Sequence, residues 1–386
     1  MRALVLAPES CTAAVQEVPT PNASTNEIIV RVHAVALNPV DALYTFNPLA
    51  PPTADPANLR VVGSDFAGVV TKLGPDVPSH VKVNDRVAGF LQGASSVNFR
   101  PGAFAEFVVV PWDLIWKIPE SMSFEEASGI SLCGLTAAQA LFGQNRLGVT
   151  APWYVQPEPE LSIENKKESR RTLLIYGAST SVGIYTAQLL RHTKEKFRLV
   201  GVASSKHFQW LSDQPYAYDH LVDYRSDWVG EVRKLTDSGG LDLAFDCISE
   251  GKTVESISEL MEPQGRLAVV RSLQGGAWKS AGKLPIQPSY GAVWEGLGKE
   301  VVYKGMHLPA NAEARAFAVD FYQWLSNQGD PVLKPHAIRM MPGGLERIVD
   351  DGFQLLGSGL MTDRVGGRTE DWMRPVTAEK LVYRTD

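Results

Sequence analysis

Cysteine and long apolar runs are scarce in this sequence, and each shortage excludes a class of protein. The 386 residues include three cysteines, Cys11, Cys133 and Cys247, which lie too far apart for a disulfide framework or a CxxC metal motif. The apolar run that opens the chain covers about five residues, which is too short for a signal peptide or a membrane span. We therefore expect a cytoplasmic protein with no leader and no membrane anchor.

The sequence also lacks an excess of positive charge. Its formal net charge is -6, and its 37 Lys and Arg residues are scattered along the chain. We therefore expect no binding to nucleic acid or to an anionic membrane, and a small molecule or a protein as partner. The length and the 44% of hydrophobic residues predict about two globular domains, each with its own core.

Short β-strands are predicted throughout the first third of the chain. Apolar or alternating runs lie between clusters of Pro, Asn and Ser at residues 2–7, 13–19, 27–37, 65–74, 85–90, 102–110 and 114–119. This spacing is typical of a small β-barrel-like domain. Ser123 and Glu126 form a capping box that predicts a helical stretch through residue 143. The polar stretch of residues 143–171 that follows is interpreted as a surface insertion.

Strands and helices alternate in the middle of the chain. Strands are predicted at residues 172–176, 198–204, 220–225, 241–248 and 266–272, and the alternation indicates a doubly wound parallel sheet. Beyond it we expect a strand at 301–307, a helix at 312–328, a strand at 336–342, a helix at 343–357 and a strand at 379–384. This last strand is a candidate to complete the first barrel.

The stretch Thr172–Gly183 joins the first strand of that sheet to a helix through small residues. Backbone N–H groups at the start of a helix bind anions, and small residues let phosphate oxygens come close. The stretch departs from G-x-G-x-x-G, so by itself it fits either a tight connection or a nucleotide site. Its place after the first strand favours a dinucleotide. We expect the phosphates to contact Gly177, Ser179, Thr180, Ser181 and Val182, through hydroxyls as well as amides.

The tip of the second predicted strand carries hydroxyl groups and a cation but no carboxylate. Ser204, Ser205, Lys206 and His207 stand where an acidic residue binds the ribose of NAD, so NADPH is predicted as cofactor. Ser204 and Ser205 would also suit the cap of the next helix, with Lys206 solvated, and these roles are compatible. Tyr224, at the tip of the third strand, fits either a contact with the same phosphate or adenine or a packing role.

These segments together resemble the medium-chain dehydrogenase/reductase superfamily over nearly the whole chain. The resemblance rests on VALNPVDALY (35–44), GSDFAGVVTKLG (63–74), GAFAEFVVV (102–110), the phosphate turn and AEKLVYR (378–384). Within the superfamily, ALNPVD, YGASTSVG and the DYR and DCI strand ends are most similar to zinc-free, quinone-oxidoreductase-like members, in particular the trans-acting enoyl reductases of fungal polyketide synthase pathways. The resemblance implies an α/β protein with a GroES-like β-barrel catalytic domain, residues 1–125 and 295–386, and a Rossmann NADPH-binding domain, residues 126–294.

The resemblance also bears on metal binding. Zinc alcohol dehydrogenases of this superfamily place a Cys ligand near Asn38 and a His-Glu pair at Ser64 and Asp65, and they carry a four-cysteine lobe. Zinc is bound by thiolate, imidazole or carboxylate in tetrahedral sets, so we predict no metal site. Without a Lewis acid to polarise an alcohol or ketone, reduction of an already activated double bond is favoured.

The mechanism implied is hydride transfer from NADPH to the β-carbon of an α,β-unsaturated thioester, with protein groups stabilising the enolate. Thr136 is the candidate catalytic hydroxyl, although an interior helix Thr bonded to its own turn fits equally well. Leu43 stands where some similar enzymes carry a basic residue, so Tyr44, water or no dedicated acid all remain open as the proton donor. The other cofactor residues implied are Val40, Asp41, Ala42, Leu43, Leu273 and Thr377. Substrate contacts are implied for Thr136, Gly143, Tyr290 and Trp294.

Three functions are compatible with these residues. The leading hypothesis is a trans-acting enoyl reductase whose substrate is tethered to an acyl carrier protein of a partner polyketide or polyketide–peptide synthase. The second is a general NADPH-dependent quinone or alkenal reductase. The third is a non-catalytic NADPH-binding sensor or partner-binding protein, because a fold alone does not decide function.

Overall fold

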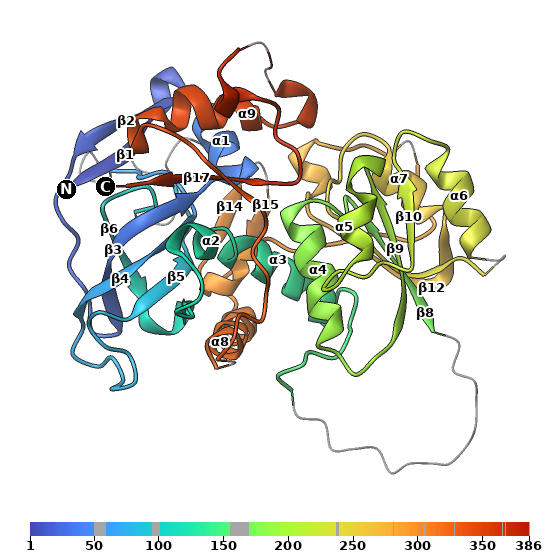
Figure 1. Ribbon diagram of the computed structural model, residues 1–386, viewed down its shortest axis with the longest axis horizontal. Helices are drawn as coiled ribbons and strands as arrows, with labels where there is room; N and C mark the ends of the chain where they lie inside the picture. Colours follow the sequence, from blue (N-terminus) through green and yellow to red (C-terminus); the bar gives the residue numbers. More distant parts are fainter. Residues whose placement is uncertain are drawn as a thin grey trace. The chain divides into compact units, whose positions relative to one another are not determined.

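Most strands predicted in the first third of the chain form a sheet that the end of the chain completes, whereas the first two, residues 2–7 and 12–17, pair with each other in a sheet of their own. The larger sheet has the order β16-β17-β3-β4-β5-β7, with β6 paired to β3. Strand β17 is antiparallel to β3 and parallel to β16, and Figure 1 shows it in red beside the blue β3. The strands of this unit are β1 (Arg2–Ala7), β2 (Thr12–Glu17), β3 (Glu27–Ala36), β4 (Asp65–Leu73), β5 (Arg86–Phe90), β6 (Phe107–Pro111), β7 (Ile115–Lys117), β14 (Val301–Tyr303), β15 (Met306–Leu308), β16 (Ile338–Met340) and β17 (Lys380–Arg384). The return of the closing strand to the first barrel is thereby confirmed.

Strand β3 is the centre of this sheet because it pairs with three neighbours and is buried along most of its length. Its ladder with β4 shifts register twice, between Ile29 and Val30 and between Val32 and Ala34. Such irregularities bend and twist a strand locally. They give the sheet the curvature that a barrel-like domain requires.

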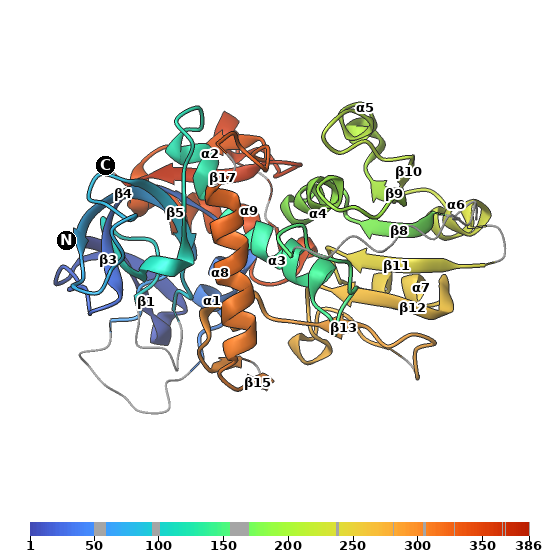
Figure 2. The ribbon, with the colours of Figure 1, turned by 90° about the horizontal axis from the view of Figure 1, so that it is seen from below.

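The helices of the same unit depart from the predicted ones at glycines. Its helices are α1 (Pro39–Phe46), α2 (Phe124–Ser128), α8 (Ala312–Ser326), α9 (Gln354–Leu356) and the first part of α3 (Ser131–Phe142), which continues into the second unit at Thr136. The capping box at Ser123 is confirmed, but the single helix predicted from it is wrong, because Gly129 ends α2 and a new helix starts at Ser131. The stretch predicted as one helix over residues 343–357 is a 3₁₀ turn, a π-helix and α9 in succession. Figure 2 shows α8 as the long helix of this unit.

The middle of the chain forms the predicted parallel sheet, with the order β10-β9-β8-β11-β12-β13. Its elements are β8 (Arg171–Tyr176), α4 (Ser181–Arg191), β9 (Phe197–Ala203), α5 (Phe208–Ser212), β10 (His220–Asp223), α6 (Trp228–Leu235), β11 (Leu241–Asp246), α7 (Thr253–Ser258), β12 (Met261–Val269) and β13 (Ser289–Tyr290). The strand order reverses between β8 and β11. Ligands of doubly wound sheets bind at this switch point, beyond the carboxyl ends of the strands.

The computed structural model divides the chain into two compact units, Met1–Leu135 with Val293–Asp386 and Thr136–Ala292. It describes residues 1–49, 59–94, 101–154, 170–236, 239–280, 282–303, 306–327, 329–364, 366 and 368–385. Most of the predicted insertion, residues 155–169, lies outside the described residues. The domain boundary expected after residue 125 lies within α2. In the structure, the first unit continues beyond it to Leu135.

Candidate active site

Buried polar side chains organise the N-terminus of α1. The Asn38 N–H donates to Asp41 Oδ2 at 2.8 Å, and the Ser64 hydroxyl donates to Asp41 Oδ1 at 2.6 Å. One turn later, Thr45 Oγ1 donates to the Asp41 carbonyl oxygen at 2.8 Å. Burial raises the pKa of Asp41 to about 7. Both carboxylate oxygens are therefore engaged in holding the start of the helix.

The ammonium group of Lys380, the first residue of β17, lies among these groups. Nζ donates to Asn38 Oδ1 at 2.5 Å and to Cys133 Sγ at 3.4 Å, and it lies 3.6 Å from Asp65 Oδ2. Asp65, the first residue of β4, accepts bonds from Asn38 Nδ2 at 2.9 Å and from the Leu132 N–H at 2.8 Å. We call the following residues the Lys380 cluster: Asn38, Asp41, Ser64, Asp65, Cys133 and Lys380.

Lys380 is charged although its side chain is only 4% exposed. Burial lowers the pKa of a lysine, but electrostatic interaction with the Cys133 and Asp65 side chains outweighs burial and raises the pKa of Lys380 above its ordinary value. The Asp65 side chain is 0% exposed. Buried charges persist when they are paired and hydrogen-bonded, and both conditions are met here.

The Lys380 cluster does not fit a zinc ion. The positions where zinc enzymes of the resembled superfamily place Cys and His carry Asn38 and Ser64, whose amide and hydroxyl are not the donors that zinc prefers. The cation among these groups is the chain's own ammonium, in contact with Asn38 and Cys133. Among the residues that the structure describes, no three His, Cys, Asp or Glu side chains are grouped to hold a metal ion.

The candidate catalytic residues lie on helices that leave the Lys380 cluster. Tyr44 is on α1, together with the predicted cofactor residues Val40 to Leu43. Its ring packs against that of Trp294 with 5.4 Å between centroids and 37° between planes. The structure thus brings together one predicted catalytic and one predicted substrate residue. Thr136 is on α3, which begins beside the cluster, and its side chain is partly exposed.

The phosphate turn has the backbone of an anion-binding connection. Gly177 has φ +81°, and a Cβ on it would lie 2.9 Å from Ile248 Cγ1. Thr180 is the N-cap residue of α4, and its hydroxyl accepts the Gly183 N–H at 3.1 Å. A Cβ on Gly183 would lie 2.4 Å from the Gly177 carbonyl oxygen, so helix and turn pack closely. This geometry suits the pyrophosphate of a dinucleotide at the start of α4.

The tips of β9 and β10 bring a further cation to the predicted ribose site. Arg225 Nη1 donates to Ser204 Oγ at 2.9 Å, and the Arg225 guanidinium lies 4.3 Å from the centroid of the Tyr224 ring. Lys206 is exposed in the 3₁₀ turn that follows Ser204. Sequence reasoning missed Arg225, although it follows Tyr224 directly. Ser204 precedes a 3₁₀ turn without a side-chain cap bond, so capping does not account for its hydroxyl.

Asp223, the last residue of β10, places a carboxylate beside the loop that follows β9. The residues at the tip of β9 gave no indication of this carboxylate. Its oxygens accept the Ser205 N–H at 3.0 Å and the Arg225 N–H at 2.9 Å. Hydrogen bonds from Ser205 and from the Arg225 backbone lower the pKa of Asp223 to about 2. In the turn after β9, burial and the charge of Lys206 lower the pKa of His207. Asp223 thus fixes the loop that carries the predicted phosphate ligands.

The remaining predicted residues are distributed over both units. Arg146 lies beside the predicted residue Gly143 and beside Gly291, which follows the predicted residue Tyr290. A Cβ on Gly143 would lie 3.3 Å from Arg146 Cδ, and a Cβ on Gly291 would overlap the Arg146 guanidinium. Leu273 is 49% exposed in a 3₁₀ turn after β12. Thr377 lies in the first unit, just before β17.

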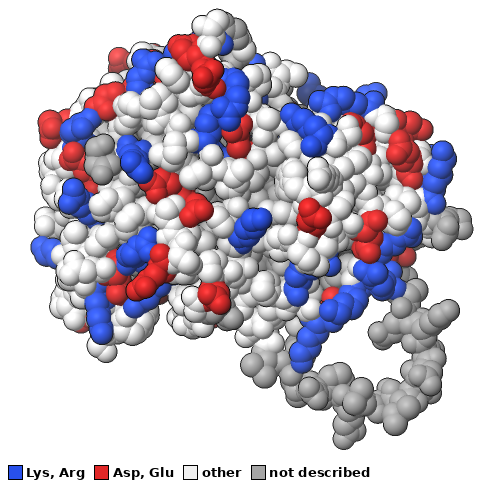
Figure 3. Space-filling view, in the orientation of Figure 1, with Lys and Arg blue, Asp and Glu red and all other residues white. Residues whose placement is uncertain are grey.

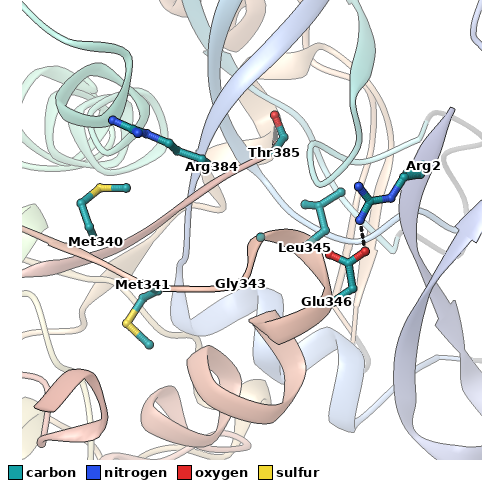
Figure 4. A pocket seen from close by; sticks show the side chains of 9 residues that line it. Arg2, Met340, Met341, Gly343, Leu345, Glu346, Arg384 and Thr385 are labelled. Atoms are coloured by element: carbon teal, nitrogen blue, oxygen red, sulfur yellow. Dashed lines mark ion pairs between the residues drawn. The ribbon is translucent and has the colours of Figure 1, made fainter. Parts of the chain in front are cut away.

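A cavity of about 490 Å³ in the first unit lies elsewhere in the fold (Figure 4). Its charged side chains are paired: Arg2 with Glu346, and Arg384 with Glu125 at 2.7 Å. None of the predicted site residues is among its lining residues, Arg2, Met340, Met341, Gly343, Gly344, Leu345, Glu346, Arg384 and Thr385. We assign this cavity no role.

Acidic and basic side chains are interspersed over most of the face seen in Figure 3, with a short run of basic side chains at its lower right. In the described part of the chain, no helix has the length and apolarity that crossing a membrane demands.

Comparison with known proteins identifies relatives of both units. A family model described as the alcohol dehydrogenase GroES-like domain matches residues 24–120, and one described as zinc-binding dehydrogenase matches residues 181–289. The trans-enoyl reductase traG of Penicillium crustosum is 32% identical over 83% of this chain and 84% of its own length. The trans-enoyl reductase caaB of Aspergillus niger is 31% identical over 86% of this chain and 87% of its own length.

Solved structures share the fold across the whole chain. An alcohol dehydrogenase superfamily protein from Novosphingobium aromaticivorans matches with a TM-score of 0.72 at 18% identity, covering 100% of both chains. The CurK enoyl reductase matches with a TM-score of 0.68 at 18% identity, covering 100% of this chain and 99% of the other. These matches agree with a barrel-like unit joined to a unit with a doubly wound parallel sheet.

Proposed function

Because the chain belongs to the trans-enoyl reductases of the medium-chain dehydrogenase/reductase superfamily, we propose that it reduces the α,β-double bond of a polyketide chain held as a thioester on an acyl carrier protein. It would act in trans on a partner polyketide or polyketide–peptide synthase, with NADPH as reductant. The observation that carries the proposal is the relationship to trans-enoyl reductases, 32% identity over 83% of the chain. Three free cysteines favour a reducing compartment, so we propose a cytosolic enzyme.

The second unit supplies the residues that would hold the pyrophosphate and the 2′-phosphate of NADPH. The amides at the start of α4, next to Gly177 and Thr180, would bind the pyrophosphate. Ser204, Lys206 and Arg225 would donate to the 2′-phosphate, because a phosphate attracts cations and hydroxyl donors. When bound, the reduced nicotinamide supplies a hydride for the β-carbon of the double bond.

The task of the chain itself is to stabilise the negative charge that develops on the thioester oxygen. The hydroxyl of Thr136 is our candidate donor to that oxygen. Tyr44, packed against Trp294, is our candidate proton source for the α-carbon. The Lys380 cluster supports this metal-free scheme, because the Lys380 ammonium lies among Asn38 Oδ1, Cys133 Sγ and Asp65 Oδ2, where it would repel a metal cation.

A direct test compares an enoyl thioester of pantetheine with a small quinone, using purified protein and NADPH. We expect oxidation of NADPH with the thioester, a product two hydrogens heavier by mass spectrometry, and negligible turnover of the quinone. Rapid quinone turnover without thioester reduction would favour the general reductase instead. Tight NADPH binding with no turnover of either compound, or of a matched carrier-bound chain, would favour a binding protein.

A further inference from the structure

One buried ammonium joins the starts of both helices that carry candidate catalytic residues. Lys380 Nζ contacts Asn38, the N-cap residue of α1, at 2.5 Å and Cys133, in the first turn of α3, at 3.4 Å. Asp65 repeats the link, since its carboxylate accepts Asn38 Nδ2 and the Leu132 N–H. A cation–carboxylate pair thus fixes two helix starts against strands β4 and β17.

These helix starts determine where the candidate groups lie. Tyr44 is on α1, which is eight residues long, and Thr136 is about one turn after the contacts of Leu132 and Cys133. A tilt or shift at either helix start is carried to these side chains, because a helix moves as a rigid rod over so short a distance. Catalysis is sensitive to displacements on the order of 1 Å in the groups that surround the reacting atoms.

We propose that Lys380 is a positioning residue of the candidate active site, and that its ammonium, paired with Asp65, fixes the starts of α1 and α3. The inference rests on the proposed function for its catalytic consequence, but the fixing of the two helix starts is independent of any substrate. Lys380 itself makes no contact with substrate or cofactor in this account.

A purely stabilising role is the alternative. Replacing both members of a buried ion pair by neutral groups of similar size often leaves stability unchanged or improves it, whereas removing one member leaves an uncompensated charge. Stability and positioning therefore separate in a double variant. Lys380→Met combined with Asp65→Asn removes both charges and retains the shape of the carboxylate and most of the length of the lysine.

The experiment compares Lys380→Met, Lys380→Arg, the double variant Lys380→Met/Asp65→Asn and a control, Lys117→Met. Lys117 pairs with Asp85 at 2.9 Å in the same unit, and its side chain is 40% exposed, so the control removes a surface lysine ion pair that is not part of the Lys380 cluster. We expect the double variant to unfold near the wild-type temperature, whereas Lys380→Met alone unfolds earlier. Below these temperatures, kcat for the enoyl thioester should fall at least about tenfold in the double variant and change less than about twofold in the control.

Two further readouts make the result specific. Hydrogen exchange in peptides spanning residues 38–46 and 131–142 should accelerate in the double variant and not in Lys117→Met, whatever substrate the enzyme prefers. Lys380→Arg, which keeps the charge, should recover part of the lost kcat. Wild-type kcat and wild-type exchange in a stable double variant would overturn the positioning role. Failure of the proposed function would appear instead as a wild-type protein that does not reduce the thioester.

Discussion

Arg225 extends the candidate 2′-phosphate site beyond the residues that the tip of β9 supplies. It reaches this position because β10 pairs with β9 in parallel, with Asp223 opposite Ala203, so residues after Asp223 return to Ser204. Its guanidinium stacks on Tyr224 and donates to Ser204 at 2.9 Å. A planar cation held in this way is preorganised for a phosphate.

Arg225→Ala should therefore weaken NADPH binding on the order of tenfold, while NADH binding changes little, because a hydrogen bond to a charged group is lost only for the phosphate. Lys206→Ala should show the same selectivity. Arg233→Ala, an exposed change on α6, is the matched control and should affect neither cofactor. The measurement is the dissociation constant of each cofactor by fluorescence titration, and equal losses for NADPH and NADH would contradict the assignment.

Residues near the candidate site were predictable where local chemistry identifies them. Ser204 and Lys206 are predicted as phosphate ligands because the second strand tip of a dinucleotide fold contacts the ribose. Lys380 was not predictable, because the groups around it come from β4, α1 and α3, far away in the sequence. In the sequence, Lys380 is only a lysine that precedes the apolar residues of a strand, and a lysine on the surface would give the same pattern.

Asp246 closes the connection between β11 and α7. Its carboxylate accepts the N–H groups of Ile248 at 2.9 Å and Ser249 at 2.7 Å, and the Thr253 hydroxyl at 2.5 Å. Burial nevertheless raises the pKa of Asp246 to about 6. The folded state therefore binds a proton more tightly than the unfolded chain does.

This shift predicts a pH dependence of stability. The contribution of Asp246 is fully present below its ordinary pKa of 3.8 and is lost as the pH rises to about 6. The free energy of unfolding of the wild type relative to Asp246→Asn should thus fall across that window, by roughly 3 kcal/mol at most. Asn retains an acceptor for the two N–H groups and offers a donor to Thr253. Urea unfolding at a series of pH values measures the difference, and a difference that rises with pH would show that the carboxylate is favoured in the folded state.

The elements themselves were predictable to different degrees. Strands of the parallel sheet were found because buried strands read as apolar runs bounded by turns. The break between α2 and α3 was not predicted, because apolar residues continue past Gly129 at helical spacing. Ser131, the first residue of α3, makes tertiary contacts that the local sequence does not indicate. One such contact is the bond from Trp116 Nε1 to Ser131 Oγ at 2.9 Å.

At the scale of the whole chain, the order of segments was more informative than any single motif. A barrel-like set of strands, a parallel sheet and a returning terminal strand predicted the architecture, and the chain folds in this way. Substrate chemistry was not predictable to the same depth. The acyl chain length that the proposed enzyme accepts could not be predicted, because the position of a predicted substrate residue such as Trp294 in the sequence gives no indication of how its side chain packs.

The proposed partnership predicts the product that a partner polyketide synthase releases in the presence of this protein. A matching polyketide synthase incubated with this protein and NADPH should release a product two hydrogens heavier than the product formed without it. Carrier-bound intermediates should be reduced faster than the same acyl chain on free pantetheine, because docking raises the local concentration. Mass spectrometry of the released product is the measurement, and an identical mass with and without the protein would contradict the partnership.

Strand β17 also affects the order in which the two units can be completed during synthesis. The second unit, Thr136–Ala292, is one continuous segment, whereas the first unit needs β17, which is translated after that segment. Without β17, residues 34–36 of β3 lack a partner on the edge opposite β4, and Asp65 lacks its ammonium partner. A chain truncated before β17 would thus retain every strand of the parallel sheet and yet leave the Lys380 cluster incomplete.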